Sequence, residues 1–127
     1  MKIENIPVHL PEETSGGVER LARPEIVLAG PGRSVIWEAV QRTCDGARIG
    51  TWFGEAGRLA VQSYPNDEVF CVTAGHIRLT GKHDPIDIMP GQGAFVPKGW
   101  SGVWENIEAS RKVFVILTST DVLEEKD

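Results

Sequence analysis

The stretch that decides the fold is residues 68–80, which read EVFCVTAGHIRLT. An apolar run containing β-branched and aromatic side chains ends at Gly75, and polar and apolar residues alternate in the run that follows. Such runs, bounded by a glycine that tolerates unusual backbone angles, are typical of β-strands rather than helices. The stretch therefore predicts the two strands of a hairpin, 68–74 and 76–79.

The same short runs recur over most of the chain, separated by turn residues. Asp45-Gly46, Pro65-Asn66-Asp67, Pro90-Gly91 and Pro97-Lys98-Gly99 supply the turn chemistry. Nine short strands at this spacing predict an all-β sandwich or barrel. The expected strands are 34–43, 48–53, 58–64, 68–74, 76–79, 85–89, 93–97, 102–106 and 112–118.

The two ends of the chain differ from this centre. Residues 1–32 hold several prolines and a polar stretch, so they are interpreted as an N-terminal arm in which 18–22 forms a helical turn. Residues 25–29 of the arm read as an edge strand that covers this barrel or that of a partner. The barrel itself is assigned to 33–118, and 119–127 to an acidic tail that frays.

A second stretch, residues 91–106, reads GQGAFVPKGWSGVWEN. Together with the first stretch it resembles the two sequence motifs of the cupin superfamily, G-x5-H-x-H-x(3 or 4)-E-x6-G and G-x5-P-x-G-x2-H-x3-N. This resemblance implies a jelly-roll β-barrel of cupin type. The positions that fit are Glu68, Gly75, Gly91, Pro97, Gly99 and Asn106.

Cupins that match both motifs hold a divalent metal with three histidines and one glutamate. Carried over by position, the histidines fall on Gln62, Tyr64 and Gly102, and the glutamate falls on Glu68. A tightly held metal needs about three or four well-placed donors. The sequence keeps one carboxylate of this set, so we expect no metal site and no cofactor.

A narrower resemblance concerns the individual residues in and after the second motif. PKGWSGVWE at 97–105, followed by Arg111-Lys112, is similar to small cupins related to the cupin domain of (S)-ureidoglycine aminohydrolase. DEVFC at 67–71 and Gly50-Thr51-Trp52 agree with that group. The resemblance covers about 33–118 and implies relatives that include a two-domain, manganese-using enzyme.

Glu68 is the candidate catalytic residue, because its motif position faces the barrel interior. There it can serve as an acid, a base or an acceptor for a polar ligand, whereas the alternative is a glutamate that only anchors a turn. Gln62 and Tyr64 are expected on the same face of the strand 58–64 and are therefore candidate ligand-binding residues. Lys98, Arg111 and Lys112 are candidate cationic partners of Glu68, and Lys98 and Lys112 are also counted as ligand-binding.

Tryptophan is abundant, with four residues in 127. Trp100 and Trp104 have glycines beside them that leave room for a flat ligand, so both are candidate ligand-binding residues. Trp37 and Trp52 are expected in the barrel core or at a dimer contact.

The net charge excludes nucleic acids and anionic membrane surfaces as partners. Thirteen Lys and Arg against 18 Asp and Glu give a net charge of −5, which repels phosphate backbones and anionic lipid. No apolar run approaches the roughly 20 residues of a membrane span.

Cys44 and Cys71 form no CxxC or Cys/His motif, and the predicted location is the reducing cytoplasm.

Three functions remain open at this stage. The first is a small-molecule-binding cupin without the usual metal, and the second is an enzyme acting on a ureido-type or other nitrogen-rich metabolite. Both require an open cavity. The third is a structural or regulatory dimer whose barrel is plugged by side chains. Relatives of this size commonly pair, and an uncovered edge strand invites pairing, so a homodimer is expected.

Overall fold

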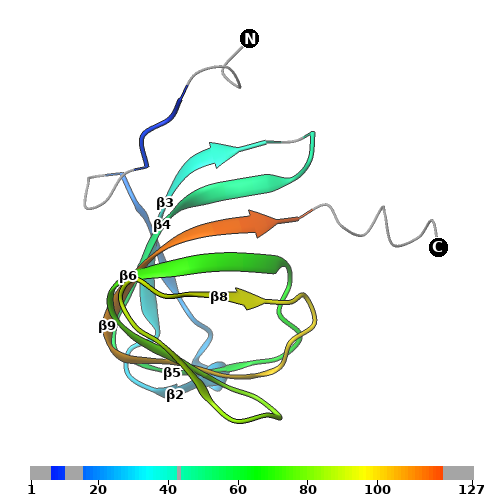
Figure 1. The fold of residues 1–127 in the computed structure, drawn as a ribbon. Helices are drawn as coiled ribbons and strands as arrows, with labels where there is room; N and C mark the ends of the chain where they lie inside the picture. The colour runs from blue at the N-terminus through cyan, green and yellow to red at the C-terminus, as the bar shows by residue number, and fades with distance from the viewer. Residues whose placement is uncertain (1–6, 11–15, 43, 119–127) are drawn as a thin grey trace, which may run out of the picture.

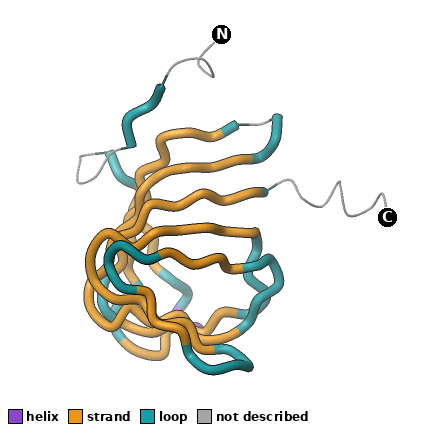
Figure 2. The backbone as a smooth tube through the Cα atoms, viewed as in Figure 1, coloured by secondary structure: helices purple, strands orange, loops and turns teal. Residues whose placement is uncertain are grey.

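A computed structural model describes residues 7–10, 16–42 and 44–118. The fold is all-β, as the sequence predicts, and Figure 2 shows mainly strands and loops. The one helix in the described part of the chain is a short 3-10 helix, η2 (Pro24–Ile26). The expected tail 119–127 and parts of the arm lie outside the described residues. The strands are β1 (Val18–Leu21), β2 (Val27–Ala29), β3 (Arg33–Gln41), β4 (Ala47–Gly54), β5 (Gly57–Val61), β6 (Asp67–Thr80), β7 (Ile86–Ile88), β8 (Gly93–Val96) and β9 (Gly102–Leu117).

The strands form one sheet that curls around an interior (Figure 1). The order along it is β1-β3-β4-β9-β5-β2, and β6 pairs with β7, β8 and β9. The C-terminal half of β9 lies between β4 and β6, while its N-terminal half lies between β5 and β6. Strand β9 therefore runs through both parts of the curled sheet and fixes their relative position.

The predicted hairpin at Gly75 is wrong, because 68–74 and 76–79 form one bent strand, β6. Its pairing with β9 shifts register around Ala74 and His76. Gly75 has a φ of +92°, and a Cβ there would lie 2.4 Å from the Ser110 Oγ. The glycine thus serves a bulge and a close approach of two strands rather than a turn.

The predicted strands 102–106 and 112–118 are likewise one strand, β9. Ser110 lies fully buried where β9 faces the bend in β6, and its Oγ accepts a hydrogen bond from the His76 N–H at 3.0 Å. The same hydroxyl lies 2.8 Å from the Glu108 carbonyl oxygen, to which it donates. A serine side chain therefore satisfies the backbone at the bend, so neither strand has to end there.

The arm joins the two ends of the strand order. The expected helical turn at 18–22 is wrong, since β1 pairs antiparallel with β3. The expected edge strand at 25–29 is shorter, with β2 pairing β5 of the same chain. The segment between β1 and β2 therefore crosses from one end of the curled sheet to the other. Within the described residues, no helix is long and apolar enough to cross a membrane.

The core lies inside the curl. Along β6 the buried positions alternate with exposed ones before the bend, so that Phe70 and Val72 point inward while Val69 and Cys71 point outward. The buried apolar residues of the core share this inner side. They are Phe70, Val72, Ile77, Leu79, Ile88, Val96, Trp104 and Phe114.

Truncating an inner residue should cost far more than truncating an outer one of the same type. Ile77 is 0% exposed and Ile86 is 50% exposed. We expect Ile77→Ala to lower the free energy of unfolding by about 2–5 kcal/mol, through lost apolar burial and a residual cavity. Ile86→Ala, the matched control, should cost less than about 1 kcal/mol. Urea denaturation of both variants checks this, and equal losses would contradict the inner and outer assignment.

Candidate functional site

A buried ion pair lies on the inner side of the sheet. Lys112 of β9 and Glu68 of β6 have side chains 5% and 3% exposed, and the Lys112 Nζ donates to the Glu68 Oε2. The pair forms because the register places Val72 opposite Lys112 and Glu68 opposite Ile116. Both side chains therefore point to the same face, separated along it by the Phe70–Phe114 pair.

Three aromatic rings surround the Lys112 ammonium. Its Nζ lies 4.9 Å from the ring centroid of Trp52 and 4.6 Å from those of Phe70 and Trp104. Ring faces attract a cation, and do so most strongly where water is excluded. Burial lowers the pKa of Lys112 below its ordinary value of 10.5, and Glu68 opposes this shift in part.

Tyr64 completes the cluster from the loop that follows β5. Its hydroxyl donates to the Glu68 Oε1, and burial, followed by the nearby carboxylate, raises the pKa of the phenol. The loop is held by two backbone hydrogen bonds of 2.8 Å, from the Tyr64 N–H to the Trp100 carbonyl and from the Gly99 N–H to the Tyr64 carbonyl. Tyr64 therefore remains a protonated donor, and each Glu68 oxygen has its own partner.

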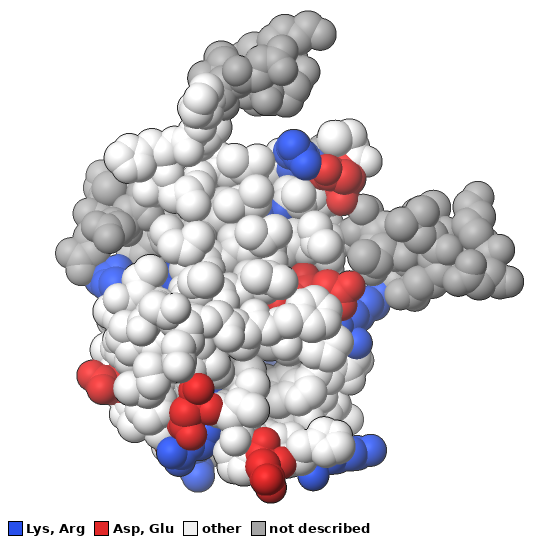
Figure 3. Space-filling model, viewed as in Figure 1, with Lys and Arg blue, Asp and Glu red and all other residues white. Residues whose placement is uncertain are grey.

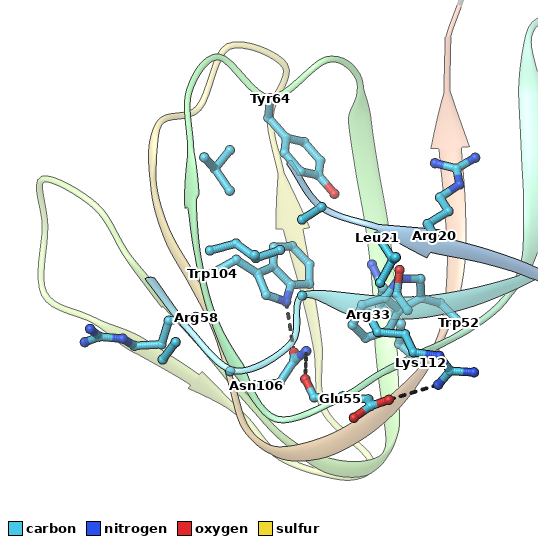
Figure 4. A pocket seen from close by; sticks show the side chains of 17 residues that line it. Arg20, Leu21, Arg33, Trp52, Glu55, Arg58, Tyr64, Trp104, Asn106 and Lys112 are labelled. Atoms are coloured by element: carbon cyan, nitrogen blue, oxygen red, sulfur yellow. Dashed lines mark hydrogen bonds and ion pairs between the residues drawn. The ribbon is translucent and has the colours of Figure 1, made fainter. Parts of the chain in front are cut away.

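A cavity of about 290 Å³ opens beside this cluster, and Figure 4 shows its lining side chains. Trp52, Tyr64, Trp104 and Lys112 form its wall on the sheet side, while the arm contributes residues from β1 and β2. A second cavity, of about 200 Å³, shares Arg20 and three of these wall residues and reaches Glu68. The barrel is therefore hollow where the ion pair lies.

The aromatic wall is fixed in place by its neighbours. Trp104 stacks on Tyr64 with ring centroids 6.1 Å apart and planes 11° apart. Its Nε1 donates to the Asn106 Oδ1 at 3.1 Å, and the Asn106 Nδ2 donates to the Glu55 carbonyl at 3.0 Å (Figure 4). The motif asparagine thus orients a wall residue.

Four of the candidate residues come together in the structure, namely Glu68, Tyr64, Trp104 and Lys112. The expectation that Gln62 shares a strand face with Tyr64 is wrong, because β5 ends at Val61 and Gln62 is exposed. The intervening Ser63 has a φ of +57°, which breaks the alternation.

The remaining candidates lie elsewhere. Lys98 is exposed, and its backbone N–H donates to the Asp67 Oδ1 at 2.8 Å. Trp100 packs edge-on against Tyr64 and lines a different cavity. Arg111, considered as a partner for Glu68, instead stacks over the Phe53 ring with its guanidinium carbon 4.8 Å from the centroid.

Trp52 and Arg20 are among the cavity residues that the sequence did not predict as site candidates. Trp52 was assigned to the core or a dimer contact, yet it lines the cavity, because β4 pairs Trp52 directly with Lys112. Arg20, assigned to a helical turn, lies on β1 opposite Ser34 and lines both cavities. Strand pairing could have predicted Trp52 as a cavity residue, whereas no local feature of the sequence marks Arg20.

The residues present do not fit the metal of the cupin motifs. Both Glu68 oxygens already accept hydrogen bonds, one of them from a cationic ammonium that would repel a metal ion. Across residues 7–10, 16–42 and 44–118, no three His, Cys, Asp or Glu side chains gather closely enough to bind one. The Lys112 ammonium supplies the positive charge at this carboxylate instead.

Comparison with known proteins agrees with this architecture. The sequence matches the EutQ-like cupin domain over residues 41–114, more than half of the chain. The chain belongs to the EutQ-like cupin family. A search of curated proteins finds no significant match.

Solved structures share the fold of this cupin at low sequence identity. A protein of unknown function in the DUF861 family from Pseudomonas syringae pv. tomato has a TM-score of 0.74 and 16% identity over 80% of this chain. A putative ethanolamine utilization protein Q from Salmonella typhimurium has a TM-score of 0.60 and 14% identity, covering 82% of this chain and 95% of its own. The cupin domain of Schizosaccharomyces pombe Cnp3 has a TM-score of 0.59 and 22% identity, covering 73% and 69%. This cupin spans only 44% of the Pseudomonas protein.

The donor set of this cupin predicts its metal content. We expect the purified protein to hold far less than one equivalent of Mn, Fe, Ni or Zn, because one engaged carboxylate cannot replace three imidazoles. Elemental analysis after dialysis against a chelator measures this. Stoichiometric metal after that treatment would contradict the assignment of Lys112 as the partner of Glu68.

The buried amine also predicts a pH dependence of stability. Below about pH 10 the unfolded chain binds more protons than the folded one, since burial lowers the Lys112 pKa, so stability should rise with pH. Above about pH 10 it should fall, because burial raises the Tyr64 pKa and only the unfolded chain releases the phenolic proton. Urea unfolding of the wild type and Lys112→Met from about pH 7 to 11 tests this. The variant should lose the rising limb, and identical slopes below pH 10 would refute the assignment.

Proposed function

We propose that this cupin binds a small organic molecule in its barrel through the Glu68–Lys112–Tyr64 cluster, without a metal. The observation that carries the proposal is a cavity of about 290 Å³ against three aromatic wall residues and a buried amine. Ligand sites are commonly concave and mostly apolar, with a few convergent polar groups. A barrel plugged by side chains would lack this space.

The wall indicates the shape of the ligand. Trp52, Trp104 and Tyr64 present flat aromatic surface to the cavity, which suits planar groups. Lys112 lines this cavity and Glu68 lines the adjoining one, so a polar group of the ligand would exchange hydrogen bonds with the Lys112 amine and, through the second cavity, with Glu68. Asn106 is already engaged on both sides of its amide and acts by orienting Trp104.

An enzymatic role on a ureido-type metabolite is the second candidate. It draws on the similarity of 97–105 to the (S)-ureidoglycine aminohydrolase group, and on the position of Glu68 between a phenol and an ammonium. Glu68 would then act as acid or base, passing protons to the ligand by way of these neighbours. The loss of the metal-ligand positions separates this candidate from the manganese chemistry of that group.

Filling the cavity tests the binding proposal. Val61 lines the cavity, whereas Val69 lies on the outer face. A library of small planar compounds should include members that raise the melting temperature of the wild type and of Val69→Phe but not of Val61→Phe. Native mass spectrometry should show a co-purified small molecule that is absent from Val61→Phe. If no compound raises the melting temperature of the wild type and Val69→Phe without also raising that of Val61→Phe, the plugged-barrel alternative is supported instead.

We also propose that two copies pair through the outer face of β3, β4, β9, β6 and β8. Val69 is 50% exposed, its neighbour Phe95 55% and Leu117 43%, and the register places Val69 between Phe95 and Val115. Figure 3 shows this face with charged side chains mainly at its margins. An apolar patch around Val69, Phe95 and Leu117 can pack against its own copy, as a two-fold interface requires, whereas a patch of one charge sign would repel its copy.

Light scattering during size-exclusion chromatography tests this pairing. The wild type should elute as a dimer at micromolar concentration, and Val69→Glu should elute as a monomer because a carboxylate would be buried in the interface. Leu28→Glu is the matched control, since Leu28 is 47% exposed on β2, which pairs with β5 and is not one of these strands. A monomeric wild type, or dimers of all three proteins, would reject this interface.

A further inference from the structure

Lys112 differs from the other lysines that the structure describes. Lys82 and Lys98 are exposed, whereas the Lys112 side chain is 5% exposed and lines both barrel cavities. Its amine is thus reachable only by a molecule that has entered the barrel. The ion pair with Glu68 also gives this amine a carboxylate in direct hydrogen-bonding contact.

An amine in this setting has the properties of a nucleophile. A lysine in an apolar pocket is more easily deprotonated, and the neutral amine attacks carbonyl carbon. Trp52, Phe70 and Trp104 surround the Nζ and burial lowers its pKa. Glu68 is in position to accept the proton that the ammonium must lose.

We propose that Lys112 captures small aldehydes or ketones in the barrel cavity by forming an imine. The proposal rests on the binding function above, because the carbonyl compound must first occupy the cavity. It extends that function by naming the ligand class as carbonyl compounds with a planar, mostly apolar body. The aromatic wall and the cavity of about 290 Å³ admit such a body beside the amine.

The capture proceeds in two steps, in which atoms and charges balance. First, the ammonium transfers a proton to Glu68, and the neutral Nζ forms a bond to the carbonyl carbon, while one N–H proton moves to the oxygen. Second, the protonated Glu68 donates to the resulting hydroxyl, the C–O bond breaks and water leaves. The product is a protonated imine paired with the Glu68 carboxylate, so the charge of the pair is the same before and after. Nothing is oxidised or reduced.

The surroundings suit the product as well as the starting amine. A protonated imine carries the same single positive charge as the ammonium, so the three rings continue to stabilise it. Tyr64 keeps donating to the other Glu68 oxygen throughout, because burial and the adjacent carboxylate keep its phenol protonated. The cluster therefore needs no rearrangement of charge to hold the adduct.

Reductive trapping tests the proposal on the full chain. Benzaldehyde and sodium cyanoborohydride convert an imine into a stable benzyl amine, which peptide mass spectrometry locates. We expect Lys112 to be modified on the order of tenfold faster than exposed Lys98, because the cavity holds the aldehyde next to the amine. Lys112→Arg, which keeps the positive charge beside Glu68, should lose this fast adduct and retain slow labelling at Lys98. An unmodified Lys112 in wild type whose Lys98 is fully labelled would overturn the proposal without relying on any variant.

Benzyl alcohol separates this proposal from the binding function. It matches benzaldehyde in size but has no carbonyl group, so saturable quenching of tryptophan fluorescence by benzyl alcohol reports occupancy alone. Quenching by both compounds, lost in Val61→Phe, together with an unmodified Lys112, would leave binding standing and reject the imine. Absence of saturable quenching by either compound would count against the binding function and, with it, against capture by Lys112.

Discussion

The rest of the site depends on one constraint, which is that a lysine ammonium buried in a barrel needs a counterion and a favourable lining. Lys112 has both, with Glu68 hydrogen-bonded to its Nζ and three aromatic rings between 4.6 and 4.9 Å away. Removing one partner of such a pair is far more costly than removing both, because the other charge is left buried alone. Lys112 and Glu68 therefore have to be understood as a unit.

The backbone of two paired strands places Lys112 and Glu68 within hydrogen-bonding distance of each other. Lys112 and Glu68 lie on neighbouring strands, β9 and β6, whose long pairing is interrupted by bulges near Ala74 and His76. The bend at Gly75 and the hydrogen bonds of Ser110 let both strands continue around the corner. As a result the inner face stays inward on both sides of the bend, and the outer face remains available as an apolar surface.

Sequence alone predicts an all-β sandwich or barrel, because period-two runs and turn residues are local signals, and the resemblance to the cupin motifs selects the barrel. The motif spacing also predicts Glu68 and Tyr64 as site candidates, while Lys112 is predicted as a cationic partner of Glu68 and Trp104 by the glycine beside it. The structure adds what local patterns cannot encode, namely that Lys112 rather than Lys98 reaches Glu68, and that Trp52 faces Lys112 across β4 and β9.

The sequence predictions that the structure contradicts also failed for physical reasons, since they depend on backbone angles and on pairing between distant segments. Gln62 leaves the inner face because of the positive φ of Ser63, an angle that serine rarely adopts. Gly75 reads as a turn because bulge and turn glycines look alike in sequence. The N-terminal strands are fixed by pairing with β3 and β5, distant in sequence, so the composition of the arm could not reveal that it lines a cavity.

A double-mutant cycle on Glu68→Gln and Lys112→Met tests the central claim most directly. Each single variant should lower the free energy of unfolding by about 3–5 kcal/mol, since the remaining group stays buried without its partner. The double variant should lose less than the sum of the two, with a coupling of about 2–3 kcal/mol. Losses that add to within about 0.5 kcal/mol would show that the two side chains do not depend on each other, and would contradict the account.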